Sequence, residues 1–131
     1  HLARAVLEGV AFSLRHAYEP LLAAGVRATR LVLAGGAARS PLIRAIVADV
    51  LAQEVTPLQI TDQSALGAAL LAAVGAGFFP DLPAACAAVV RYAPPVTPNP
   101  ARVAVYRGLY ERYHGLYPKL RDDAHALRRF G

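Results

Sequence analysis

The first part of the chain carries apolar side chains at helical spacing. Gly25 follows them and is a typical stop signal, so the segment before it is predicted to form one long helix. The opposite side is also apolar, at Leu2, Val6 and Val10, which predicts cover from more than one direction. The predicted main buried face recurs at intervals of four, three, four and three residues and consists of Leu7, Ala11, Leu14, Tyr18 and Leu21.

A short run over residues 30–34, apolar after Arg30, predicts a central strand that is buried on both faces. Gly35 and Gly36 end it. Ser40 is a good N-cap and Pro41 suits a first helical turn, so a helix is predicted from there to about Ala52. Its predicted buried face is Ile43, Ile46, Val47, Val50 and Leu51.

A second strand is predicted over residues 55–60. Pro57 favours an edge position or limits the pairing of this strand, because proline has no N–H for a ladder. Asp62 or Ser64 then begins a helix over residues 65–74. That helix is rich in very small side chains, which predicts close packing against a sheet or another helix. These side chains are Gly67, Ala68, Ala69, Ala72 and Ala73.

Two more helices are predicted after these elements. Asp81 and Pro83 indicate a short helix that ends near Val90, which completes a core over residues 1–91. A proline-rich extended connector over residues 92–100 leads to a C-terminal helix over residues 101–131, with a bend expected at Pro118. Tyrosines repeat along this helix, and at helical spacing they favour a packing face over base stacking: Tyr106, Tyr110, Tyr113 and Tyr117.

The alternation of helices and strands predicts an α/β fold with right-handed crossovers. Only two clear strands are present, whereas a stable sheet usually needs three or more, so further strands are expected in a longer parent polypeptide. The 131 residues match one domain in size. With 56% hydrophobic and 18% charged residues, the composition is unlike that of disordered chains.

Charge and cysteine content narrow the class of protein. The net charge is +5, and half of the 14 Lys and Arg residues lie in the last third, where they alternate with acids. This pattern favours a solvated helix face over nucleic-acid binding. No apolar run is long enough for a membrane span, and the N-terminus lacks a secretion signal, so a cytoplasmic protein is expected. Cys86 stands alone, which predicts a buried free thiol.

The turn at Gly35 and Gly36, which connects the predicted strand to a capped helix, is the strongest candidate for a ligand site. Glycines let a ligand approach the backbone, and a helix start favours an anion. The turn has neither the Rossmann nor the Walker pattern, and a plain strand-to-helix turn remains an alternative. The histidines and Cys86 show no metal-ligand spacing, so no metal site is predicted.

No acid is predicted to act as a catalytic base. Asp49 is expected on a partly exposed helix face, Asp62 as a cap, and the pair Asp122 and Asp123 in solvent. Glu8 lies among apolar residues and is expected to pair with an arginine.

Three blocks, at residues 1–12, 31–42 and 64–77, resemble the FGGY family of carbohydrate kinases, and the tyrosine-rich tail is similar to the end of its xylulose kinases. The resemblance implies the C-terminal part of a ribonuclease-H-like, actin-like ATPase domain. ATP and sugar would meet in a cleft against a missing N-terminal domain. By motif position, Gly35, Gly36 and Ala37 would run beside the adenosine and α-phosphate, and Ser40 would face adenine.

The resemblance also implies what the chain does. The parent would use ATP and Mg²⁺ to phosphorylate a sugar hydroxyl, with D-xylulose favoured. The family's phosphate loop and catalytic aspartate match nothing in residues 1–131, and His1 falls inside a family signature, so this piece alone is expected to be inactive. A non-catalytic nucleotide-binding or regulatory module of actin-like fold is the alternative. Homodimerisation stays open.

Overall fold

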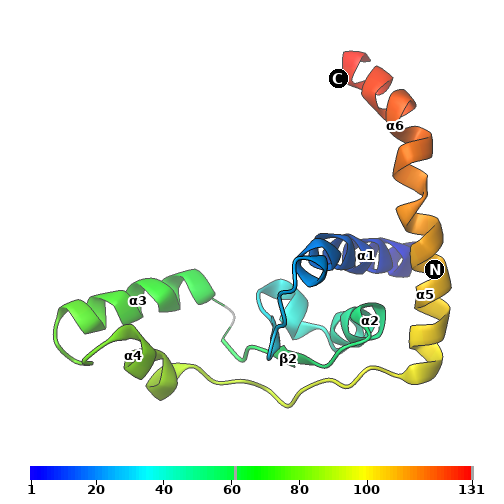
Figure 1. The fold of residues 1–131 in the computed structure, drawn as a ribbon. Helices are drawn as coiled ribbons and strands as arrows, with labels where there is room; N and C mark the ends of the chain where they lie inside the picture. Colours follow the sequence, from blue (N-terminus) through cyan, green and yellow to red (C-terminus); the bar gives the residue numbers. More distant parts are fainter. Residues whose placement is uncertain (61, 131) are drawn as a thin grey trace.

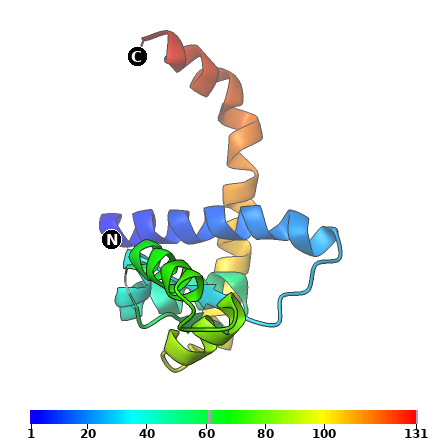
Figure 2. The same cartoon turned by 90° about the vertical axis from the view of Figure 1, so that its left-hand side faces the viewer.

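The computed structural model describes residues 1–60 and 62–130 and shows a helix-rich α/β chain. The long helix α1 (Leu2–Ala23) lies across α2 (Pro41–Leu51) and α5 (Pro100–His114), as Figures 1 and 2 show. On another side of the molecule, α3 (Gln63–Gly75) packs on α4 (Leu82–Val89) (Figure 1). The predicted long first helix and the short helix after Asp81 are confirmed.

Two strands form a parallel pair. β1 (Leu31–Leu33) and β2 (Val55–Pro57) are in register, with Leu31 opposite Val55 and Leu33 opposite Pro57, and α2 makes the crossover between them. β2 is an edge strand of this two-stranded sheet, as Pro57 predicts, and its other side forms an isolated antiparallel bridge to the proline-rich connector. Val55 and Val96 exchange two backbone hydrogen bonds there, at 3.2 and 2.8 Å. Pro57 still takes part by accepting the N–H of Ala93 at 2.8 Å.

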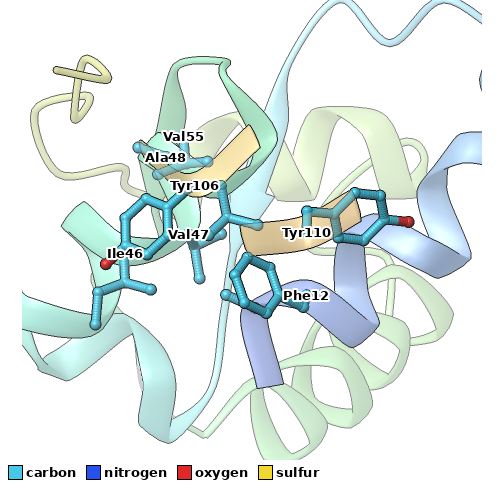
Figure 3. Packing of buried hydrophobic residues seen from close by; sticks show 9 residues of the cluster. Phe12, Ile46, Val47, Ala48, Val55, Tyr106 and Tyr110 are labelled. Atoms are coloured by element: carbon cyan, nitrogen blue, oxygen red, sulfur yellow. The ribbon is translucent and has the colours of Figure 1, made fainter. Parts of the chain in front are cut away.

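The core lies where α1, α2 and α5 meet. Phe12 of α1 packs against the rings of Tyr106 and Tyr110, with centroids 6.0 and 5.9 Å away (Figure 3). The predicted buried face of α2 is confirmed at its centre, at Ile46, Val47 and Val50. The other buried members of this cluster are Ala11, Ala48 and Val55.

Several expected contacts are missing from the described chain. Leu14 and Leu21 of α1 are exposed, because the helix turns Ala11 and Phe12 toward α2 and α5 instead. Val32, predicted to lie in a strand buried on both faces, is 46% exposed because only one face of the sheet is covered, by α2. The predicted packing of α3 against another helix is present, on α4, but it does not involve Gly67, where an added Cβ would meet no atom within 4 Å.

The C-terminal segment is two helices and not one. α5 ends at His114, Gly115 makes the junction, and α6 (Leu116–Leu127) leads away from the body into the short turn η2 (Arg128–Phe130) (Figure 2). The break is therefore at Gly115 and not at Pro118. Pro118 lies in the first turn of α6, where helical N–H groups lack partners anyway, so proline causes no break. The tyrosine packing face is confirmed at Tyr106 and Tyr110, whereas Tyr117 is exposed.

Two similar groups of hydrogen-bonded side chains, each with an arginine, a glutamate and a tyrosine, join α1 to α5. Glu8 accepts from Arg4 Nε and from the Tyr106 hydroxyl, both at 2.8 Å, which confirms the predicted arginine partner. Burial raises the pKa of the Glu8 carboxyl, but these hydrogen bonds outweigh it and hold the pKa below its ordinary 4.5. The second set has the same design, from Arg15, Glu19 and Tyr110.

Three smaller expectations also have outcomes. Asp49 is only 2% exposed, so the predicted partly exposed position is wrong, because α5 covers it. Cys86 is free but only half-buried. Among the described helices, none combines the length and apolar character that crossing a membrane requires.

Candidate functional site

The carboxyl ends of both strands lie at the same edge of the sheet. Because Leu33 pairs with Pro57 in parallel register, the turn after β1 and the loop after β2 leave the sheet side by side. In open α/β sheets, ligands bind outside the carboxyl ends of the strands. This edge is therefore where a ligand site is expected.

The turn after β1 has an unusual backbone that requires glycine. Gly35 has φ 72° and ψ −159°, a region that residues with a Cβ rarely adopt. A short 3-10 helix, η1 (Gly36–Arg39), follows, and the N–H of Ala38 donates to the Gly35 carbonyl at 3.1 Å. An added Cβ at Gly36 would meet no atom within 4 Å, so the backbone there is open to a close ligand.

Ser40 caps α2 as predicted. Its Oγ accepts the N–H of Ile43 at 3.4 Å, and Pro41 occupies the start of the helix. The hydroxyl is half-buried and keeps its own proton to donate. A contact from Ser40 to a base stays a prediction.

The turn and the start of α3 enclose an open hollow of about 530 Å³. Of the four predicted site residues, Gly36 lines it, Gly35 and Ser40 flank it along the chain, and the side chain of Ala37 lies outside the described part of the structure. The lining residues are Gly36, Arg39, Asp62, Gln63 and Ser64.

The sequence motifs do not indicate the other four lining residues as candidates for a ligand site. Asp62 and Ser64 were predicted only as helix caps, and Asp62 does cap α3 by accepting the N–H of Ala65 at 2.9 Å. Arg39 and Gln63 were given no role. The parallel pairing of the two predicted strands was the available signal, since it places the segments that follow them at the same edge.

The hollow offers complementary groups to a polar ligand. Arg39 supplies a guanidinium that can donate to phosphate oxygens, and the Asp62 carboxylate can accept from hydroxyl or amino groups. Gly36 supplies backbone without a side chain in front of it. Within residues 1–60 and 62–130, no group of three or more His, Cys, Asp or Glu side chains could hold a metal ion.

Comparison with known proteins places the chain in a class of enzymes. A sequence model of the C-terminal domain of the FGGY family of carbohydrate kinases matches residues 1–76, which include the turn, α2 and α3. The chain therefore belongs to the FGGY family of carbohydrate kinases.

Individual relatives are enzymes that act on different substrates. A xylulose kinase of Lactococcus lactis is 35% identical over 99% of this chain and 26% of its own length. A ribulokinase of Mycolicibacterium smegmatis is 39% identical over 96% of this chain and 23% of its own length. The crystal structure of a xylulose kinase from Rhodospirillum rubrum matches 95% of this chain and 25% of its own, with a TM-score of 0.79 and 38% identity. The chain thus spans about a quarter of the length of the curated relatives it matches.

Proposed function

We propose that this chain is the C-terminal, ATP-binding part of a sugar kinase that transfers the γ-phosphate of ATP to a sugar hydroxyl. The convergence of the Gly35–Gly36 turn with the start of α3 around one hollow is the observation that carries the proposal. Membership of the family adds support. The fold of the parent would be actin-like, with two ribonuclease-H-like domains, and this chain would form part of the second.

The residues around the hollow fit a nucleotide. Open backbone at Gly36 admits the nucleoside closely, Arg39 attracts phosphate, and the Asp62 carboxylate matches ribose hydroxyls. Phosphoryl transfer also needs a positioned sugar, Mg²⁺ and usually a carboxylate base. We assign these parts to the preceding three quarters of the parent, so the role of this chain is to bind and orient the nucleotide.

D-xylulose is the proposed sugar. Support comes from the similarity to xylulose kinases along almost the whole chain, while the ribulokinase shows that related chains serve other pentuloses. The test is a coupled ADP-release assay of the full-length kinase against pentuloses, hexuloses and polyols with ATP and Mg²⁺. Turnover highest with D-xylulose is expected. A higher kcat/KM with another substrate would overturn the sugar, and no ADP release with any of them would overturn the kinase.

Gly36→Val in the full-length kinase tests the nucleotide site. The position has open space and no positive φ, so valine should fold normally while its side chain occupies the hollow. The KM for ATP should rise about tenfold or more, since a displaced ligand loses several contacts. Gly108→Val, at an open glycine of α5 away from the hollow, is the matched control. An unchanged KM for ATP in Gly36→Val would remove this turn from the site.

The 131-residue chain by itself is proposed to bind ATP weakly and to show no turnover, because the family's catalytic groups match nothing in it. Isothermal titration with ATP and Mg²⁺ measures the affinity. Micromolar binding would contradict this part of the proposal, since it would mean that the piece organises the site without the rest of the cleft.

A further inference from the structure

The side chain of Arg44 reaches back from α2 to the turn beside the hollow. Its Nε–H donates to the carbonyl oxygen of Ala38, in the middle of η1. Ala38 is buried, and its own N–H donates to the Gly35 carbonyl at 3.1 Å. One arginine thus ties the centre of the turn to the first part of the following helix.

This contact completes the hydrogen bonding of a very short helix. A 3-10 helix of four residues leaves its last carbonyl groups without helical partners, and a buried carbonyl without a partner is unfavourable. Arg44 supplies the partner and also brings positive charge behind the turn. With the Ala38 carbonyl fixed, the neighbouring residues Gly36 and Arg39 are held where they line the hollow.

We propose that Arg44 is a positioning residue for the nucleotide: it contacts no ligand, and it holds the Gly35–Ser40 turn in the shape that binds one. This inference rests on the proposed function. Other arginines also donate to backbone carbonyls away from the hollow, and Arg91 is one of them. Arg91 donates to the carbonyls of Ala88 at 2.7 Å and Val90 at 3.0 Å, at the end of α4.

Steady-state kinetics of the full-length kinase separate positioning from general stability. Arg44→Ala should raise the KM for ATP about tenfold, the loss expected for one hydrogen bond from a charged donor. The KM for the sugar and kcat should stay within about twofold, and Arg44→Lys, which keeps a charged donor, should recover part of the loss. Arg91→Ala should leave the KM for ATP unchanged. A rise of less than twofold in Arg44→Ala, or an equal rise in Arg91→Ala, overturns the inference.

A second measurement needs no activity. In the 131-residue chain, Arg44→Ala should speed hydrogen exchange of the Ala38 amide by about tenfold, while the Ile43 amide, held by Ser40, exchanges as before. Unchanged exchange at Ala38 overturns the inference whatever the kinetics show. If the wild-type kinase uses no nucleotide, the proposed function fails and exchange alone decides whether Arg44 holds the turn. If Arg44→Ala does not fold, Arg44→Lys carries both measurements, with a smaller change of the same sign expected and no change overturning the inference.

Discussion

Asp49 offers the sharpest test of how this chain is held together. It is 2% exposed at the contact of α2 with α5. Oδ1 accepts the backbone N–H of Asn99 at 2.7 Å, and Oδ2 pairs with Arg102 Nε at 2.5 Å. Asn99 in turn caps α5 by accepting the N–H of Ala101 at 3.0 Å. Replacing Asp49 with alanine therefore removes the group that anchors the start of α5.

The size of the effect follows from what each partner loses. The Asn99 N–H loses a hydrogen bond to a charged acceptor, about 1.5–3 kcal/mol. Arg102 is half exposed and regains water, so its pair adds only about 0–1 kcal/mol. Asp49→Ala should lower the free energy of unfolding by about 1.5–4 kcal/mol. Asp49→Asn keeps a neutral acceptor and should cost about half as much, since hydrogen bonds to neutral groups are weaker.

Urea unfolding of the 131-residue chain, followed by circular dichroism, measures these differences. Asp122→Ala is the matched control, because Asp122 also pairs with an arginine, Arg121, at 3.1 Å but is 89% exposed. It should change the free energy of unfolding by less than about 0.5 kcal/mol. If Asp49→Ala costs no more than Asp122→Ala, the carboxylate does not anchor α5 and the reasoning is refuted.

Two further predictions concern the contact of α1 with α5. Phe12→Ala should lower the free energy of unfolding by about 3–5 kcal/mol in the same assay, because the ring packs among three tyrosine rings. Leu14→Ala, on the exposed side of α1, should lower it by less than about 0.5 kcal/mol. Similar losses for the two variants would show that α1 does not turn Phe12 toward α5. The folded state lowers the pKa of Glu8 and of Glu19 below 4.5, so their stabilisation is present above that pH and is lost as pH falls through the lowered values. Urea midpoints should thus decline below about pH 4.5, and the decline should shrink in Glu8→Gln/Glu19→Gln; an equal decline in that variant would assign the pH dependence to other groups.

Local chemistry made α2 predictable from the sequence. Ser40 followed by Pro41 specifies a helix start without help from distant residues, and the structure has the cap and the proline in those places. The periodic apolar positions Ile46, Val47 and Val50 then select the buried face. Neighbours within one or two turns decide each of these features.

Most of the incorrect predictions concern contacts between segments that are far apart in the sequence. Asp49 looks exposed in the sequence because its partners, Asn99 and Arg102, lie about fifty residues further along. The wall of the hollow formed by α3 was missed for the same reason: it takes the parallel register of β1 and β2 to bring Arg39 near Asp62. The tyrosines of α5 were correctly predicted as a packing face, but their polar partners on α1 could not be read from periodicity.

A second group of errors runs in one direction, since positions predicted as buried are exposed. Val32 on the open face of β1, Leu14 on α1, and Ala68 and Ala69 on α3 all belong to it. Apolar periodicity records where a side chain lies in the complete folded polypeptide, and relatives of this chain are about four times its length. We propose that these surfaces are covered in a parent kinase of that length. Leu14→Asp should then leave the free energy of unfolding of the 131-residue chain nearly unchanged. In the full-length kinase it should lower the free energy of unfolding by about 2 kcal/mol or more, because a charge would be buried without a partner. Equal tolerance in both would mean that this side of α1 faces water in the whole enzyme as well.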